Sequence, residues 1–123
     1  MIYQKLFDKY INFIEPSLQK RRFKHHDIVG LINALPFEKQ IVGLSFEERK
    51  IYKIKVGQGK RKILLWSQMH GNEATATMAI FDILNFLKPQ EDDFQDFRNK
   101  ILNKLELNFV PMLNPDGAER FIR

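Results

Sequence analysis

The chain has no cysteine among its 123 residues. This absence excludes disulfide bonds and thiolate metal sites, so any metal centre must rely on histidine nitrogen and carboxylate oxygen. Long hydrophobic runs are lacking as well. No apolar stretch comes near the about 20 residues that cross a bilayer, and no basic segment followed by an apolar run opens the chain. We therefore expect a soluble, cytoplasmic protein that does not enter a membrane.

Acidic residues are scarce in the first half of the chain. Residues 1–62 contain 14 Lys and Arg against 6 Asp and Glu, whereas residues 63–123 contain 6 against 9, within a net charge of +5. Basic clusters at 20–24 and 60–62 are compatible with a polyanion-binding domain. Short basic runs beside turns are more typical of solvated surface, so we expect no nucleic-acid partner and rank polyanion binding last.

Two helices are predicted in the first third of the chain. Apolar residues at helical spacing indicate an amphipathic helix over 2–14 and a second helix over 28–35, which Pro36 ends. The adjacent His25 and His26 precede the second helix. Because neighbouring side chains point in different directions, we interpret both histidines as cap or surface residues rather than as metal ligands.

The period of the apolar pattern changes after residue 40. It predicts four strands and two helices, with strands at 41–46, 52–56, 63–66 and 105–110 and helices at 74–87 and 94–104. The continuous run at 63–66 is typical of a strand that is covered on both faces. The final strand, two helices and strand predict parallel pairing. We expect one domain over residues 1–123, with a helical lead-in over about 1–36 and an α/β part over about 40–123.

The most informative residues for chemistry lie between the strand at 63–66 and the helix that follows it. His70 and Glu73 stand where ligands of α/β sheets bind, beyond the carboxyl end of a strand. An imidazole and a carboxylate three residues apart can converge on one Zn²⁺, and Gly71 lets the backbone turn tightly between them. The pair alone is also compatible with a surface hydrogen bond or a helix-terminal charge. A zinc centre would need a third protein ligand from elsewhere.

A second motif, Asn114-Pro115-Asp116-Gly117, ends the last predicted strand. These residue types form turns and need no function to explain them, so a turn is the expected structure. Its position adds interest, because neighbouring strand ends would bring the motif beside the His70 loop.

Together, His70-Gly71-Asn72-Glu73 and residues 114–121 resemble the zinc carboxypeptidase family, the carboxypeptidase A-like metallopeptidases. Residues 43–52 are similar to the hairpin that precedes the first ligands in that family, so three motifs follow one another in the family's order. The resemblance covers roughly residues 25–123 and depends on the combination of motifs rather than on any one of them.

The resemblance implies that His70 and Glu73 are the first two zinc ligands of an enzyme that hydrolyses the C-terminal bond of a peptide substrate. It also implies an arginine that polarises the scissile carbonyl, for which Arg123 is a better positional match than Arg120. The family's third ligand, its catalytic glutamate and its carboxylate-binding Asn-Arg pair would lie beyond Arg123. We therefore expect the isolated chain to bind zinc weakly and to hydrolyse nothing detectable. The alternative is a non-catalytic module that binds zinc or peptides.

The resemblance further implies the fold. We expect the N-terminal part of a mixed, largely parallel sheet flanked by helices, in the three-layer α/β/α arrangement of zinc peptidases, and we expect it to be incomplete. The missing part would leave apolar surface and an unpaired strand edge near the C-terminus. Self-association through that exposed edge is therefore expected to be possible.

Overall fold

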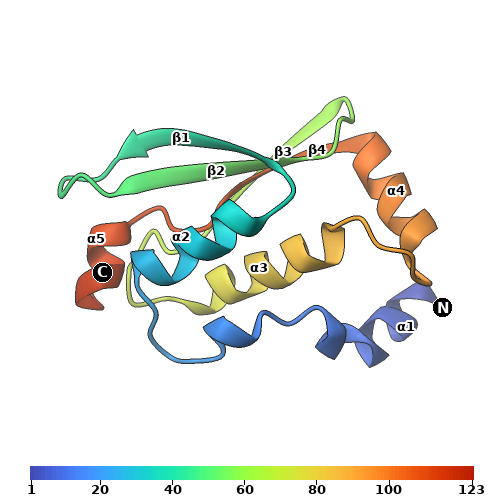
Figure 1. Cartoon of the computed structure of the whole chain (residues 1–123), viewed down its shortest axis with the longest axis horizontal. Coiled ribbons are helices and arrows are strands. Elements are labelled where there is room, and N and C mark those ends of the chain that lie inside the picture. Colours follow the sequence, from blue (N-terminus) through green and yellow to red (C-terminus); the bar gives the residue numbers. More distant parts are fainter.

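The structure, a computed structural model, describes residues 1–123. Its elements are α1 (Ile2–Asp8), η1 (Tyr10–Asn12), η2 (Pro16–Leu18), α2 (His25–Ala34), β1 (Glu38–Leu44), β2 (Lys50–Val56), β3 (Arg61–Trp66), α3 (Thr75–Leu87), α4 (Gln95–Lys104), β4 (Leu105–Val110) and α5 (Pro115–Arg120). In Figure 1 the sheet lies above α2 and α3, and the segment from α1 to η2 runs along the other side of α3.

The four strands form one mixed sheet in the order β1-β2-β4-β3. The pair β3 and β4 is parallel, as the strand, two helices and strand predicted, with Ile63 opposite Leu107. The other two pairs, β1 with β2 and β2 with β4, are antiparallel. The predicted mixed α/β fold is confirmed, although parallel pairing is the minority among these four strands.

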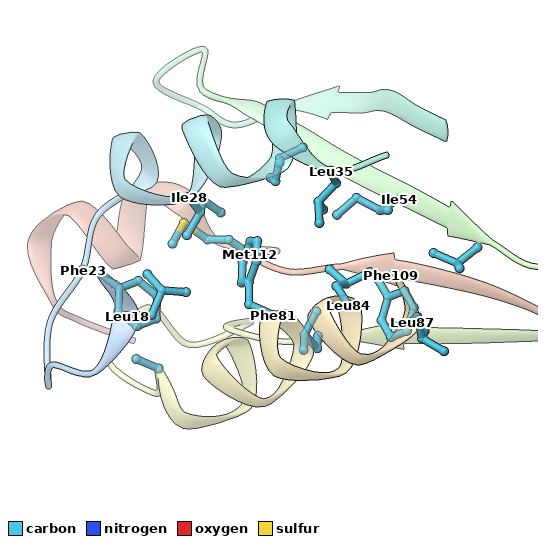
Figure 2. Packing of buried hydrophobic residues seen from close by; sticks show 14 of the residues in the cluster. Leu18, Phe23, Ile28, Leu35, Ile54, Phe81, Leu84, Leu87, Phe109 and Met112 are labelled. Atoms are coloured by element: carbon cyan, nitrogen blue, oxygen red, sulfur yellow. The ribbon is translucent and has the colours of Figure 1, made fainter. Parts of the chain in front are cut away.

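The core lies on one face of this sheet (Figure 2). Ile54 of β2 and Phe109 of β4 are paired neighbours, and both are almost completely buried. The helices α2 and α3 cover them with a shared apolar cluster. The members that α2 and α3 contribute are Ile28, Ile32, Ile80, Phe81, Leu84 and Leu87. The predicted burial of the helix after the His70 loop is therefore confirmed for one side of α3.

The opposite face of the sheet is uncovered at β3. Leu64 and Trp66 are 58% and 52% exposed, so the expectation that this strand is covered on both faces is wrong. The reason is that α2 and α3 pack on the same face, which leaves no helix for the other one. The free edges of the sheet belong to β1 and β3, while the C-terminal strand β4 is paired on both sides. Self-association through an edge stays a prediction, now placed at β3 rather than at β4.

The lead-in differs from the single long helix that its periodicity predicts. Helix α1 ends at Asp8, and a 3₁₀ turn over Tyr10–Asn12 follows. The chain bends here because it is tied to α3: the buried Asp82 carboxylate accepts hydrogen bonds from the Tyr10 hydroxyl and from the Glu15 backbone N–H. The second predicted helix is confirmed as α2. None of the helices has both the length and the hydropathy that a membrane span requires.

Candidate metal centre

The loops that follow β3 and β4 lie side by side at one edge of the sheet. Backbone hydrogen bonds continue the parallel pairing past the strands, from Leu113 N–H to the Ser67 carbonyl and from Asn114 N–H to the Gln68 carbonyl, both at 2.9 Å. Parallel strands end at the same edge, and this geometry brings the His70 loop and the motif at 114–117 together. The two sequence motifs are therefore neighbours in space.

His70 and Glu73 point toward each other at the start of α3. Their Nδ1 and Oε2 atoms are 3.1 Å apart, and the two side chains are 31% and 61% exposed. The turn between them is closed by a hydrogen bond from Glu73 N–H to the His70 carbonyl. Two ligands of one tetrahedral zinc stand about 3.3 Å apart, given bonds of about 2.0–2.1 Å. The spacing of this nitrogen and this oxygen thus fits a shared Zn²⁺.

Arg123 also lies at this edge. Its Nη2 lies 3.4 Å from Nδ1 of His70. Arg120, the weaker positional match, pairs instead with Glu47. The structure thus brings Arg123, and not Arg120, to His70, and the role of Arg123 in polarising a carbonyl stays a prediction.

A second feature of the site is a close contact between two glycines. A Cβ atom on Gly71 would stand 1.9 Å from the carbonyl carbon of Gly117, well inside the distance that any real side chain tolerates. The sequence suggests that Gly71 serves a tight turn, but its φ is not in the left-handed region. Glycine is required here because two backbones touch, one from each loop.

Buried polar side chains hold the base of the His70 loop. Thr77 of α3 donates to Oε1 of Gln68, and Gln68 in turn donates to the Gly71 carbonyl, each at 2.8 Å. Ser67 lies 2.8 Å from the Thr77 hydroxyl and donates to the Pro111 carbonyl at 2.6 Å. Gln68 has a φ of 51°, which costs energy for a residue with a side chain, and these bonds hold it there.

Sequence reasoning missed Ser67, Gln68 and Thr77. The available signal was a Ser-Gln pair directly after an apolar strand and a threonine on the buried side of α3, because buried polar groups need partners.

The predicted turn at 114–117 is the first turn of a short helix. Pro115 begins α5, and the Asn114 side chain caps it by accepting a hydrogen bond from Gly117 N–H at 2.9 Å. The expectation of a simple turn is therefore wrong, because an asparagine cap followed by proline also starts a helix. The cap residue serves the site as well, since Asn114 Nδ2 donates to the Met69 carbonyl at 3.2 Å.

A hollow of about 650 Å³ opens beside Glu73. Trp66, Met78 and Phe121 give it apolar walls, and Arg21 of the lead-in reaches it. His25 and His26 contribute nothing to it. His25 contacts the Lys50 carbonyl at 2.8 Å and His26 is exposed beside Asp27, in agreement with their interpretation as cap or surface residues. No cluster of three or more His, Cys, Asp or Glu side chains that could hold a metal is present in residues 1–123.

A comparison with models of known protein families agrees with the resemblance that the sequence motifs show. The family model for zinc carboxypeptidases matches residues 36–122, which include His70, Glu73 and all of α5. The chain belongs to the zinc carboxypeptidase family. The matched part begins after α2, so the lead-in lies outside it. A comparison with curated protein sequences found no match.

Solved metallocarboxypeptidases share the fold. A candidate carboxypeptidase A from Shewanella denitrificans is 26% identical over 80% of this chain, with a TM-score of 0.67. A metallo-carboxypeptidase from Burkholderia cenocepacia is 22% identical over 80% of this chain, with a TM-score of 0.69. The bovine thrombin-activatable fibrinolysis inhibitor, solved with a tick carboxypeptidase inhibitor, is 18% identical over 85%, with a TM-score of 0.67. The chain covers 27%, 28% and 34% of these three proteins, about a third of their length or less.

Proposed function

We propose that this chain supplies part of the active site of a zinc-dependent metallocarboxypeptidase, which hydrolyses C-terminal peptide bonds. The observation that carries the proposal is the convergence of His70 and Glu73 at 3.1 Å within the segment that matches the family. An imidazole nitrogen and a carboxylate oxygen are both ligands that catalytic zinc accepts, and the absence of cysteine leaves few other choices.

In this proposal His70 and Glu73 hold the ion, which when bound supplies a water acidic enough to lose a proton near neutral pH. Gly71 and Gln68 fix the loop, so that both side chains face the same edge of the sheet. Arg123 directs its guanidinium toward this edge, where it binds the carbonyl oxygen of the scissile bond and stabilises the negative charge that develops there.

The substrate that we propose is the C-terminal end of a peptide. Support comes from the family itself and from the bovine relative, which was solved with a tick carboxypeptidase inhibitor. Residues 1–123 offer two candidate ligands and no candidate for a third. We therefore propose that the chain by itself binds zinc weakly and does not turn over substrate.

The test is release of the last residue from a peptide that carries a C-terminal reporter. The 123-residue chain should give no detectable release with added zinc. A longer form of the protein that supplies a third ligand and a base should give release that a chelator and His70→Ala both abolish. Chelator-sensitive turnover by the short chain would contradict the proposed incompleteness, and a zinc-loaded longer form without turnover would contradict the proposed activity.

A non-catalytic zinc- or peptide-binding module is the second candidate. The observation that favours it is that residues 1–123 contain no group of three or more His, Cys, Asp or Glu side chains that could hold a metal, whereas a catalytic zinc uses three protein ligands. Such a module should bind a peptide with a free C-terminal carboxylate, should lose that binding in Arg123→Ala, and should show no turnover in any longer form. Turnover by a longer form would decide for the enzyme.

A further inference from the structure

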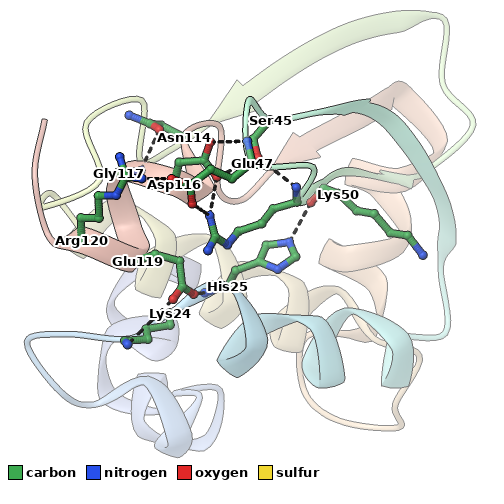
Figure 3. A network of polar contacts seen from close by, with 11 residues as sticks. Lys24, His25, Ser45, Glu47, Lys50, Asn114, Asp116, Gly117, Glu119 and Arg120 are labelled. Carbon is green, nitrogen blue, oxygen red and sulfur yellow. Dashed lines mark hydrogen bonds and ion pairs between the residues drawn. The ribbon is translucent and has the colours of Figure 1, made fainter.

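Asp116, the second residue of α5, joins that helix to the turn between β1 and β2 (Figure 3). Its Oδ1 accepts hydrogen bonds from the Ser45 hydroxyl at 2.7 Å and from the Arg49 guanidinium at 2.6 Å. Its Oδ2 accepts the Glu47 backbone N–H at 3.0 Å. Only 15% of the Asp116 side chain is exposed. We call Ser45, Glu47, Arg49 and Asp116 the Asp116 clasp.

Helix α5 depends on such contacts for its position. It has six residues, and a helix of that length is not stable alone in water. Beyond the clasp, Arg120 pairs with Glu47, and Glu119 accepts the His25 backbone N–H at 3.2 Å. The segment is therefore held from the hairpin on one side and from the start of α2 on another (Figure 3).

Helix α5 also contacts the candidate metal centre. Gly117, next to Asp116 in sequence, is the residue on which Gly71 rests. The chain then leaves the helix through Phe121, which is left-handed with a φ of 55°, and places Arg123 3.4 Å from His70. A displacement of α5 would thus move both the support of the His70 loop and the arginine beside it.

We propose that Asp116 is a positioning residue for the metal centre: the Asp116 clasp fixes α5, and α5 fixes the His70 loop and Arg123. The inference rests on the proposed function of His70 and Glu73 for its effect on metal binding, but its structural part does not. No hydrogen bond or ion pair joins Asp116 or Arg49 to His70 or Glu73, so the clasp acts through Gly117.

The molecule contains a matched control at its other end. Asp92 accepts two hydrogen bonds from the Arg98 guanidinium, at 2.9 and 3.2 Å, and one from the Phe94 backbone N–H at 2.9 Å. Like Asp116, Asp92 is a mostly buried carboxylate that accepts hydrogen bonds from one arginine and from one backbone N–H. It contacts no residue of the His70 loop. Asp92→Asn therefore reproduces the loss of the charge without touching the metal centre.

The first arm of the experiment is hydrogen exchange in Asp116→Asn and Asp92→Asn, without metal. In Asp116→Asn the new amide NH₂ would face donors that now find an acceptor, which loosens α5. We expect exchange of the Glu73 amide, which donates to the His70 carbonyl, to be at least tenfold faster in Asp116→Asn than in Asp92→Asn. Equal exchange in the two variants would overturn the inference.

The second arm measures Co²⁺ binding by its visible absorption. We expect the dissociation constant to rise at least fivefold in Asp116→Asn and to stay within twofold of the wild-type value in Asp92→Asn. If wild type and His70→Ala bind Co²⁺ alike, the proposed metal site fails, and the exchange arm still decides on the positioning role. If Asp116→Asn does not fold, Arg49→Lys replaces it, with an expected two- to threefold effect in both arms; no effect would overturn the inference.

Discussion

The two ends of the parallel strands β3 and β4 are built with the same kinds of contact, but only one of them holds the candidate metal centre. At the site end Gly71 rests on the backbone of Gly117, and at the far end Gly59 rests on the backbone of Lys104, where an added Cβ would stand 1.9 Å from the carbonyl carbon in each case. Each end also has an aspartate held by an arginine, Asp116 by Arg49 and Asp92 by Arg98.

The difference lies in the span of these contacts. Asp92 and Arg98 are six residues apart, so the far end is a local structure that closes the connection between α3 and α4. Asp116 and Arg49 are 67 residues apart, and their contact aligns segments that the chain would otherwise leave independent. A long-range contact can set the relative position of two segments, and this site needs it because Arg123 and the His70 loop belong to different segments.

The largest expected effects come from replacing Gly71 and Gly59, and Co²⁺ binding should distinguish the two variants. Gly71→Ala and Gly59→Ala should each lower the free energy of unfolding by about 3 kcal/mol, because the new methyl group overlaps backbone atoms. Only Gly71→Ala should also weaken Co²⁺ binding, by at least tenfold. Gly30→Ala, in the middle of α2 with nothing within 4 Å, is the control and should gain about 0.5–1 kcal/mol. Equal loss of metal binding in both destabilised variants would break the comparison.

Removal of the far arginine should give the next effect. Arg98→Ala leaves Asp92 without its guanidinium and removes a cation that lies 4.9 Å from the centre of the Phe86 ring. We expect a loss of about 2–3 kcal/mol in urea unfolding, since Arg98 is only 2% exposed. Co²⁺ affinity should change less than twofold. A larger change would show that the far end also positions the site.

Tyr10→Phe tests the hydrogen bond between the lead-in and α3, which lies at neither end of β3 and β4. The hydrogen bond to Asp82, together with burial, raises the pKa of Tyr10 from 10.0 to about 12. The folded state holds this proton more tightly, so the contribution is complete below pH 10 and is lost as the pH rises toward 12. Tyr10→Phe should cost about 1 kcal/mol at pH 7 and should flatten the decline above pH 10. An unchanged alkaline decline would contradict this.

The smallest expected effect is the change with acidic pH in the stability difference between wild type and Asp92→Asn. The hydrogen bond from Arg98 lowers the pKa of Asp92 below its ordinary value of 3.8, despite an opposing effect of burial. The stabilisation is therefore complete above pH 3.8 and is lost as the pH falls through the lower pKa of the folded state. The stability difference between wild type and Asp92→Asn should shrink as the pH falls from about 5 to about 2. A difference that is constant across that range would argue against the ion pair.

Much of the fold could be predicted because local patterns determine it. The alternation in β2, the run at 105–110 and the buried side of α3 follow from apolar periodicity, and the position of His70 and Glu73 follows from a strand that ends before a helix. The exposure of Trp66 could not be predicted, because it depends on the face of the sheet against which α2 and α3 pack.

The contacts that align the site were also beyond sequence reasoning. Nothing near Asp116 indicates that its partners are Ser45 and Arg49, since such pairing exists only after the hairpin and α5 have met. The same holds for Asp82, a buried carboxylate in an apolar helix whose partners lie 67 and 72 residues away. A polar side chain on a buried element indicates that a hydrogen-bond partner exists, but it does not identify the partner residue.

The most direct test of the account is a calorimetric titration of Zn²⁺ into the wild type, His70→Ala, Glu73→Gln and His26→Ala. The account predicts one weak site per chain that is lost in His70→Ala, weakened at least tenfold in Glu73→Gln, and unchanged in His26→Ala, which removes an exposed histidine outside the centre. Equal binding by all four proteins would contradict the central claim that His70 and Glu73 share one ion.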